Sequence, residues 1–364
     1  MRVGVPKEIK NHEYRVGLTP PSVAELVAAG HSVVVETRAG AGIDFEDQDY
    51  IDVGASIVPT AAEVFAHSDM IVKVKEPQPQ EIALLESRHL LFTYLHLAAD
   101  KPQALGLMAS GATCIAYETV TAADRSLPLL KPMSEVAGRM SVQVGAHYLE
   151  KEQGGRGVLL GGVPGVAPAR VAILGGGVSG VNAAQMAVGM RADVTIYDIN
   201  NARLAELDMF FSSQIKTAYA SKAAIAAAVK NAHLVIGAVL VPGAAAPKLV
   251  TREMLKTMKR GSVLVDIAID QGGCFETSHA TTHADPVYEV DGVIHYCVAN
   301  MPGAVARTSA FALNNATLPF VLKLAGLGAE AAMASDPHLA NGLNVSGGKI
   351  RHPAVAEAID LQLN

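Results

Sequence analysis

The stretch VAILGGGVSGVNAAQMAVGM, residues 171–190, decides the fold of this chain. It passes from a short β-branched segment through a run of glycines into an alanine-rich segment of helical character. Gly175, Gly177 and Gly180 form the pattern G-x-G-x-x-G between the predicted strand and the predicted helix. In that pattern the glycines permit a tight turn, close approach of a pyrophosphate to the backbone, and close packing of helix on strand. The stretch therefore predicts a dinucleotide-binding βαβ unit.

The next predicted strand, DVTIYD, supports that interpretation because it ends in an acid, Asp198. The acid follows Gly180 at close to the expected offset of about 20 residues. A carboxylate there accepts the ribose hydroxyls of NAD and repels the 2′-phosphate of NADP, so NAD is favoured. Arg203 lies nearby and is the residue type that accommodates the extra phosphate, so NADP stays as the alternative. The structural alternative is a tight turn with Asp198 as a helix cap.

Outward from this unit, short β-branched runs alternate with longer alanine-rich runs, a pattern typical of parallel sheets with helical crossovers. We predict an α/β fold with two Rossmann-like, doubly wound parallel-sheet domains separated by a cleft. The first domain is discontinuous, residues 1–130 plus 305–364, and carries substrate binding and catalysis. Residues 131–304 form the NAD-binding domain. Strands are predicted at 2–5, 32–36, 70–75, 90–96, 113–118, 170–174, 193–198, 234–237, 262–269 and 293–297, and longer helices at 134–151, from 178, and at 308–325.

Composition narrows the function classes. The 364 residues contain 29 Lys and Arg against 35 Asp and Glu, a formal net charge of −6, so a nucleic-acid partner is not expected. The longest charge-free stretch, 171–190, is interrupted by glycines and by polar residues, so no membrane span is predicted. The N-terminal MRVGVPKEIK lacks a signal-peptide core, and we expect a cytoplasmic protein.

Metal binding is also disfavoured. The three cysteines form no C-x-x-C pair. Cys274, His279 and His283 are close in sequence, but one cysteine with two histidines is not a recognised zinc pattern. We predict no metal site.

Three predicted strands of the first domain end in ionisable residues, namely Lys75, His96 and Glu118. Open α/β sheets bind ligands outside the carboxyl ends of their strands. A lysine there can hold a carboxylate and polarise a carbonyl, and a histidine transfers protons near neutral pH. The alternatives are a solvated lysine and a histidine at the sheet edge, and Glu118 is expected to be structural. In the second domain Asp270 ends the predicted strand SVLVDIAID, either as a catalytic carboxylate or as a loop cap.

The order of several separated motifs resembles the alanine dehydrogenase family, which includes the nucleotide-binding subunit of proton-translocating transhydrogenases. The motifs are VPKEIKNHEYRVGLTP, MIVKVKEP, LLFTYLHLAAD, PMSEVAGRMSVQVGAHYLEK, the glycine loop, DIAIDQGGCFETS and HYCVANMPGAVARTS. The resemblance implies an NAD-dependent enzyme that interconverts L-alanine with pyruvate and ammonium, and a homo-oligomer, often a hexamer.

Residue by residue, the resemblance implies roles that local pattern alone does not give. Arg15, which locally is read as a solvated surface arginine, and Lys75 would bind substrate, while His96 and Asp270 would be catalytic. The implied cofactor contacts are Ser134, Gly175, Gly177, Val178, Ser179, Gly180, Asp198, Arg203, Val239, Leu240, Ile267, Asp270, Val298, Ala299, Asn300 and Met301. The chain departs from the family pattern at His279, where an arginine is expected, and at Ala220, where a serine is expected.

Other functions remain open at this point. A transhydrogenase subunit would bind NAD(H) without turning over alanine, and it would lead toward a membrane region, which this sequence does not show. A catalytically silent NAD-binding protein is disfavoured by the intact set of Arg15, Lys75, His96 and Asp270. A related dehydrogenase that joins lysine to oxoglutarate would differ in the size of its pocket.

Overall fold

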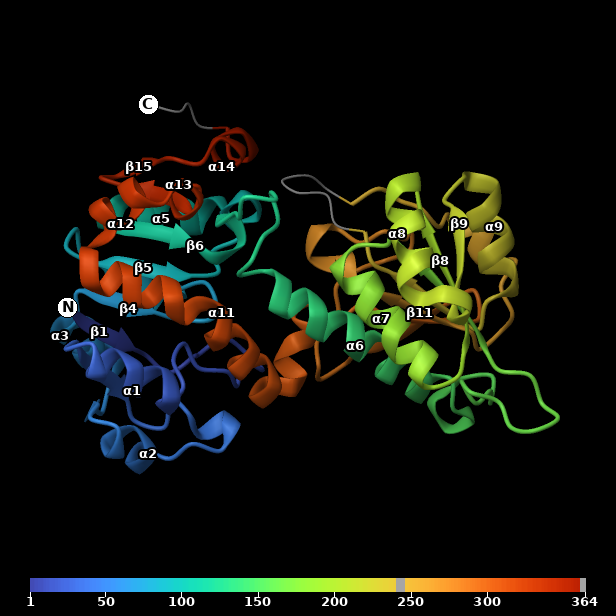
Figure 1. The fold of residues 1–364 in the computed structure, drawn as a ribbon, viewed down its shortest axis with the longest axis horizontal. Helices are drawn as coiled ribbons and strands as arrows, with labels where there is room; N and C mark the ends of the chain where they lie inside the picture. The colour runs from blue at the N-terminus through green and yellow to red at the C-terminus, as the bar shows by residue number, and fades with distance from the viewer. Residues whose placement is uncertain (240–245, 361–364) are drawn as a thin grey trace. The chain divides into compact units, whose positions relative to one another are not determined.

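The computed structural model describes residues 1–239 and 246–360. The chain divides into two compact units (Figure 1). The first is Met1–Met133 with Val305–Asn364, and the second is Ser134–Ala304.

The first unit is built on an eight-stranded sheet in the order β15-β14-β6-β5-β4-β1-β2-β3. Strands β1 to β6 run parallel in the doubly wound order 3-2-1-4-5-6, and β14 pairs antiparallel with β6. The order reverses beside β1, so β1 and β4 flank the switch point where such sheets bind ligands. The strands are β1 Arg2–Val5, β2 Ser32–Glu36, β3 Ser56–Val58, β4 Met70–Val72, β5 Leu90–Thr93, β6 Thr113–Ala116, β14 Leu343–Ser346 and β15 Lys349–Ile350.

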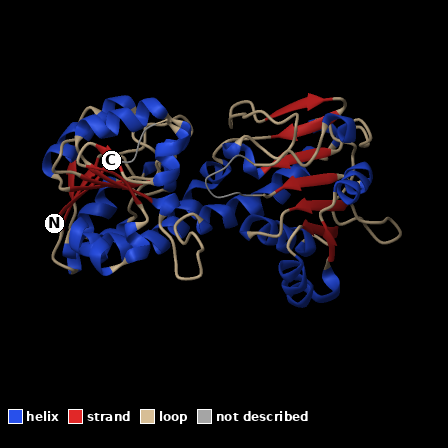
Figure 2. Ribbon diagram, turned by 90° about the horizontal axis from the view of Figure 1, so that it is seen from above, coloured by secondary structure: helices blue, strands red, loops and turns tan. Residues whose placement is uncertain are grey.

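Helices cover both faces of this sheet (Figure 2). The central strands are buried on both sides, and β4 and β5 contribute Ile71 and Leu91 to a core that includes Val64 and Phe65 of a covering helix. The helices are α1 Pro20–Ala28, α2 Asp47–Asp52, α3 Ala61–His67, α4 Pro79–Ile82, α5 Lys101–Ser110, α11 Ala306–Leu327, α12 Ala329–Ser335, α13 Pro337–Ala340 and α14 Pro353–Ala358, with 3₁₀ turns Ala41–Ile43, Leu97–Ala99 and Tyr117–Thr119.

One helix of the first unit, within Met301–Leu327, is long and apolar enough by length and composition to cross a membrane. It also packs as a core helix, because α11 buries side chains such as Leu313, Val321 and Leu324. A core helix passes the same test of length and composition, so this helix alone is weak evidence for a membrane span.

The second unit has a seven-stranded sheet in the order β12-β13-β11-β10-β7-β8-β9. All neighbouring strands are parallel except β12 and β13, so the order again is 3-2-1-4-5-6 with an added edge strand. The strands are β7 Arg170–Leu174, β8 Asp193–Asp198, β9 Lys216–Tyr219, β10 Leu234–Gly237, β11 Val263–Asp266, β12 Val287–Val290 and β13 Val293–Tyr296. The helices are α6 Lys131–Tyr148, α7 Val178–Gly189, α8 Asn201–Phe211, α9 Lys222–Asn231 and α10 Arg252–Leu255, with 3₁₀ turns Lys151–Gln153, Ser212–Gln214, Ile267–Gln271 and Met301–Val305.

The predicted α/β class with two Rossmann-like domains is confirmed by these two sheets. Several predicted boundaries are wrong. Strands predicted at 70–75, 90–96, 113–118, 262–269 and 293–297 end earlier, at Val72, Thr93, Ala116, Asp266 and Tyr296. The residues that follow these ends lie in loops or 3₁₀ turns. The strands were predicted too long because the apolar runs continue past the last hydrogen bond of the ladder.

The start of one helix also differs from the prediction. The helix predicted at 134–151 is α6, Lys131–Tyr148, so Ser134 lies inside its first turn and is no N-cap. Pro132 is tolerated there because first-turn N–H groups have no helical partner. Thr19 occupies the N-cap position of α1, but its side chain makes no capping hydrogen bond and instead contacts Ser22 Oγ at 3.3 Å.

Candidate active site

The carboxyl edge of the first sheet carries the ionisable residues that follow β4, β5 and β6. Lys75 comes three residues after the end of β4, His96 three residues after the end of β5, and Glu118 two residues after the end of β6. Since these strands are parallel neighbours, their carboxyl ends lie at one edge of the sheet. Arg15 follows β1, the neighbour of β4 on the other side.

Lys75 is held through its backbone. Its N–H donates to Glu8 Oε1 at 3.3 Å, the N–H of Val74 donates to the same atom at 2.6 Å, and its carbonyl accepts a hydrogen bond from Thr93 Oγ1 at 2.9 Å. The residue is 9% exposed. Its Nζ lies 4.0 Å from Glu76 Oε2, beyond hydrogen-bond distance. The fold thus fixes the backbone from which the ammonium extends, and the ammonium makes no short contact to that carboxylate.

Glu8 belongs to a buried charge network that sequence reasoning missed. Lys73 Nζ lies 3.0 Å from Glu8 Oε2 and 2.7 Å from Glu81 Oε1, and all three side chains are buried. Burial lowers the pKa of Lys73, but the two carboxylates outweigh it and raise that pKa above its usual value. Removing one partner of such a network leaves a buried charge uncompensated, which is strongly destabilising. The network ties the segment after β1 to the segment after β4.

Arg15 is also buried, at 3% exposure. Its Nε and Nη2 donate to the two oxygens of Glu13 at 2.6 and 2.5 Å, and its Nη1 donates to Met133 Sδ at 3.0 Å. The local interpretation of a solvated surface arginine is therefore wrong. A bidentate pair fixes the plane of a guanidinium. In the sequence, the residue that could have indicated this pair is Glu13, two residues away in HEYRVG.

His96 has an unusual backbone. Its φ is +51°, in the left-handed region that non-glycine residues rarely occupy. Glu118 Oε1 accepts its N–H at 2.6 Å, and both Glu118 oxygens accept the N–H of Leu95 at 3.2 Å. The imidazole stacks on the Tyr94 ring at 5.8 Å between centroids, with an interplanar angle of 7°. Its side chain remains 42% exposed. Glu118, expected to be structural, is the acceptor that holds this strained turn.

In the second unit, the glycine loop has the shape that the motif predicts. Gly175 has a φ of +108°, and a Cβ built on Gly180 would lie 1.9 Å from Gly175 O. A Cβ on Gly177, the N-cap of α7, would meet no atom within 4 Å. The backbone is thus open where a pyrophosphate approaches and tight where helix meets strand. The residues present fit a dinucleotide.

The acid after β8 braces this loop. Asp198 Oδ2 accepts the N–H of Gly176 at 2.7 Å, and Oδ1 accepts the N–H of Asn200 at 2.8 Å. Arg203 Nε donates to Gly176 O at 2.8 Å, and its Nη1 pairs with Glu206 at 2.7 Å. The positive charge of Arg203 is therefore partly neutralised by Glu206, which lies on the same helix, α8.

The turn after β11 carries Asp270. Asp266, at the end of the strand, is buried and accepts hydrogen bonds from Ala268 N at 3.1 Å, Cys274 N at 2.9 Å and Ser278 Oγ at 2.5 Å. Burial raises the pKa of Asp266. These bonds fold residues 267–278 into a compact turn, and Asp270 lies exposed on its 3₁₀ segment.

The residues considered for a metal are engaged elsewhere. Cys274 Sγ donates to Asp266 Oδ1 at 3.4 Å, the His279 ring stacks on Tyr288 at 3.6 Å, and His283 Nε2 lies 3.0 Å from Asn300 O. Within residues 1–239 and 246–360 no group of three or more His, Cys, Asp or Glu is arranged to hold a metal ion.

The other residues implied as cofactor contacts are distributed over the second unit. Val178 and Ser179 begin α7, Val239 follows β10, Ile267 follows β11, and Asn300, with a φ of +68°, follows β13. Val298, Ala299 and Met301 flank Asn300, and Ser134 lies in the first turn of α6. Leu240 lies outside the described residues.

Comparisons with known proteins give a consistent result. The family model "Alanine dehydrogenase/PNT, N-terminal domain" matches residues 4–137, and the corresponding C-terminal domain model matches residues 141–353. The alanine dehydrogenase of Halomonas elongata is 60% identical over 362 residues, covering 100% of this chain and 98% of that protein. The alanine dehydrogenase of Mycolicibacterium smegmatis is 56% identical, covering 99% and 97%.

Solved structures agree with the sequences. An L-alanine dehydrogenase matches with a TM-score of 0.96 at 56% identity, over 99% of both chains. A transhydrogenase from Sinorhizobium meliloti matches with a TM-score of 0.82 at 28% identity, over 97% of this chain and 100% of that one.

Proposed function

The chain belongs to the alanine dehydrogenase/PNT family, as its sequence predicts, and on that premise we propose that it is an NAD-dependent L-alanine dehydrogenase. The reaction is the reversible oxidative deamination of L-alanine to pyruvate and ammonium. The observation that carries the proposal is the full-length likeness to alanine dehydrogenases at 60% identity. The domain predicted at residues 1–130 plus 305–364 would bind the substrate, and the domain predicted at residues 131–304 would bind the dinucleotide.

In the first unit, Arg15 and Lys75 would hold the substrate. A guanidinium whose plane is fixed by Glu13 suits the carboxylate, and an ammonium at a fixed strand end suits the carbonyl oxygen of pyruvate. Lys75 is nearly buried, which strengthens its attraction for an anion relative to water, whereas the charge of Arg15 is in part neutralised by Glu13.

His96 and Asp270 would carry the proton transfers. The bound nicotinamide supplies the hydride acceptor in deamination and the hydride donor in amination. Loss of hydride from Cα leaves an iminium on the substrate, which water attacks. An imidazole nitrogen of His96 takes the proton from that water and returns one to the departing ammonia, while the Asp270 carboxylate stabilises the cationic states. The exposed imidazole of His96 is accessible for this exchange.

We propose NAD as the cofactor because the arrangement of Asp198 and Arg203 after β8 disfavours the binding of a 2′-phosphate. Asp198 presents a carboxylate beside the glycine loop, and Arg203 is engaged by Gly176 and Glu206. The further contacts would come from Ser134, Gly175, Gly177, Val178, Ser179, Gly180, Val239, Ile267, Asp270, Val298, Ala299, Asn300 and Met301, together with Leu240. We also propose that the protein forms a homo-oligomer and is located in the cytoplasm.

The second candidate is a nucleotide-binding subunit of a proton-translocating transhydrogenase. It is favoured by the likeness to the Sinorhizobium meliloti transhydrogenase, although at 28% identity. Such a subunit would bind NADH without any dependence on pyruvate.

A spectrophotometric assay of NADH oxidation separates the two. We expect oxidation that requires both pyruvate and ammonium, and a loss of at least about 100-fold in kcat for His96→Ala and Asp270→Ala. NADH binding without pyruvate-dependent turnover would reject the dehydrogenase. Unchanged turnover in both variants would reject the catalytic roles while leaving the reaction in place.

A further inference from the structure

Three cations and a histidine gather at the amino-terminal edge of the second sheet. Arg170 begins β7, and its N–H donates to His233 Nδ1 at 2.9 Å while the N–H of His233 donates to Arg170 O at 2.9 Å. Lys259 lies in the turn before β11, the neighbour of β10, which His233 precedes. The N–H of Arg156 donates to Gly261 O at 3.0 Å in the same turn.

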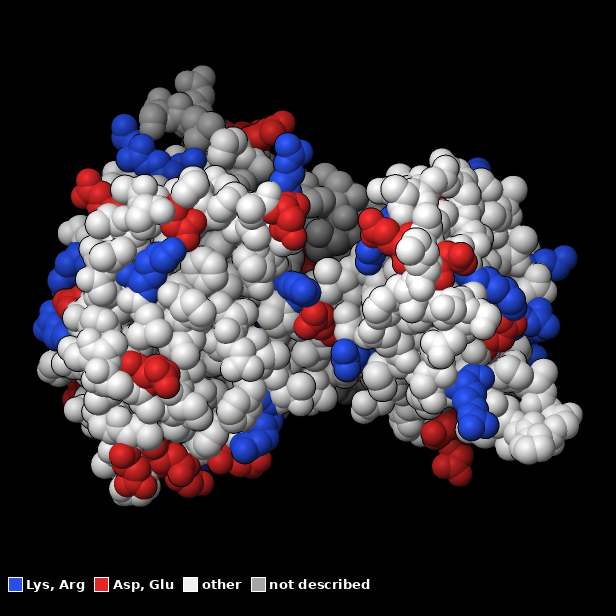
Figure 3. All heavy atoms as spheres, viewed as in Figure 1, with Lys and Arg blue, Asp and Glu red and all other residues white. Residues whose placement is uncertain are grey.

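Among the described residues these cations have no acidic partner, whereas other cations near them do. In the part of the chain that the structure describes, the side chains of Arg156, Arg170 and Lys259 make no ion pair and no hydrogen bond. Lys216 pairs with Asp193 at 2.5 Å and Arg260 with Glu289 at 3.7 Å. Basic and acidic side chains are likewise interspersed on the face of the second unit drawn in Figure 3. The Nε of Arg156 is buried without any hydrogen-bond partner.

The pKa values of His233 and Lys259 are consistent with this excess of positive charge. Burial, and then Lys259, Arg156 and Arg170, lower the pKa of His233 to about 4. Burial and the two arginines also lower the pKa of Lys259. The carboxyl end of α9 lies just before His233, but a helix end supplies only about half a negative charge. Asp193 lies opposite Arg170 in the β7–β8 register but is paired with Lys216, so among the described residues the three cations have no carboxylate of their own.

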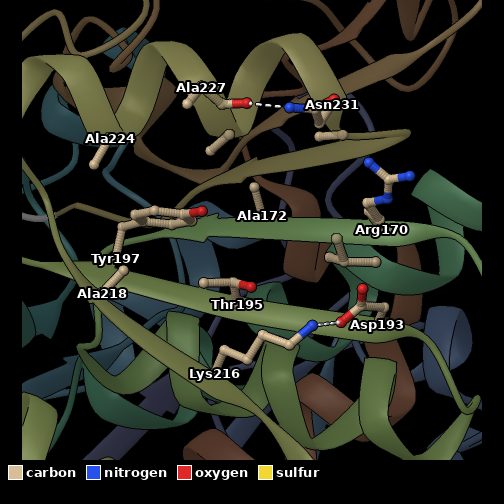
Figure 4. Close-up of a pocket in the computed structure, with 13 residues that line it drawn as sticks. Arg170, Ala172, Asp193, Thr195, Tyr197, Lys216, Ala218, Ala224, Ala227 and Asn231 are labelled. Carbon is tan, nitrogen blue, oxygen red and sulfur yellow. Dashed lines mark hydrogen bonds and ion pairs between the residues drawn. The ribbon is translucent and has the colours of Figure 1, made fainter.

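A cavity of about 390 Å³ adjoins the cluster. It lies between α9 and the strands β7, β8 and β9, with Arg170, Thr195, Tyr197 and Asn231 in its lining (Figure 4). Figure 4 shows Lys216 bonded to Asp193, while Arg170 makes no bond to the residues drawn. Arg170 is the member of the cluster that lines this space, which can hold more than a single ion.

We propose that Arg156, Arg170 and Lys259 bind a phosphate group, free or carried by a small phosphate ester. Guanidinium groups match phosphate oxygens geometrically, and three cations suit a dianion better than a carboxylate. The site is separate from the glycine loop. Arg170 and Leu174 are the two ends of β7, four residues apart, so about 13 Å of strand lies between the two positions.

Titration calorimetry of the full-length protein at constant ionic strength tests the proposal. NADH is present at saturation, so that the pyrophosphate position at the glycine loop is filled. Inorganic phosphate and glycerol 3-phosphate are the two probes. We expect binding at one site per chain, weakened at least tenfold in Arg156→Gln and in Lys259→Gln. Arg260→Gln is the matched control, because it removes the same charge from a side chain that is paired with Glu289.

The outcomes divide cleanly. Equal affinity for both probes supports a site for free phosphate, and tighter binding of the ester supports a site for a phosphorylated metabolite. Absence of phosphate binding to the wild type, or equal weakening in all three variants, would overturn the proposal. Thermal unfolding shows whether each variant is folded, and Arg170→Gln replaces any variant that is not.

Discussion

Glu118→Gln tests whether the carboxylate behind His96 sets the position of the imidazole. In the native protein Glu118 Oε1 accepts the His96 N–H at 2.6 Å, and both oxygens accept the Leu95 N–H at 3.2 Å. The glutamine keeps one acceptor oxygen but turns an amide N–H₂ toward a backbone N–H. Hydrogen bonds to charged groups contribute about 1.5–3 kcal/mol, so we expect a loss of about 2 kcal/mol.

That loss falls on a strained residue. The left-handed backbone of His96 costs about 1–2 kcal/mol, and without the carboxylate the turn relaxes to a conformation in which the imidazole is displaced. A cost of about 2 kcal/mol corresponds to about 30-fold in kcat. The KM for NADH should stay unchanged, since Glu118 is not among the proposed cofactor contacts.

The assay is pyruvate- and ammonium-dependent NADH oxidation, with urea unfolding measured in parallel. Asp336→Asn is the matched control, because Asp336 Oδ1 also accepts two backbone N–H groups, from His338 and Leu339, at 3.1 Å. It should lose comparable stability and keep kcat within about twofold. Wild-type kcat in Glu118→Gln, or an equal fall in Asp336→Asn, would refute the positioning role.

Further predictions concern the second unit. Gly180→Ala should destabilise the protein by about 1–3 kcal/mol in urea unfolding and weaken NADH binding, since its Cβ would lie 1.9 Å from Gly175 O. Gly189→Ala, in the same helix, is the control: its Cβ would meet no atom within 4 Å, so this variant should not be destabilised. Asp198→Asn should reduce the preference for NADH over NADPH at least tenfold in direct binding measurements, and an unchanged ratio would count against the assigned role of that carboxylate. Burial lowers the pKa of His295 to about 4, so below about pH 6.5 the unfolded chain binds a proton at this residue that the folded protein does not, and stability decreases as the pH falls from about 6.5 to 4. His233 contributes in the same direction, so in urea unfolding the loss of stability between pH 7 and pH 5 should be smaller by about 2 kcal/mol in His295→Gln than in the wild type, and an equal loss in both would contradict this account.

The sequence was most informative where function demands special backbone or strand-end residues. The glycine pattern at 175–180, the acid at Asp198 and the ionisable ends near β4, β5 and β6 could all be read from local pattern. Strand ends were overestimated because apolar residues continue into buried turns, as between Asp266 and Ile269.

Long-range charge pairing was beyond local pattern. Lys73 and Glu8 are 65 residues apart, and nothing in MIVKVK indicates that Lys73 is fully buried between two carboxylates. Arg15 gives the same lesson, since its burial depends on how the loop after β1 packs. The cation cluster around Arg170 draws on four separate segments, which only the sheet order brings together.

The central claim is that hydride passes between the nicotinamide and Cα of alanine on this chain. The most direct measurement incubates the protein with NADH that carries deuterium at both C4 positions, pyruvate, ammonium and NADP⁺, and analyses the products by mass spectrometry. The account predicts alanine one mass unit heavier, labelled at Cα, with no deuterium in NADPH. Unlabelled alanine, or deuterium appearing in NADPH in place of alanine, would contradict it.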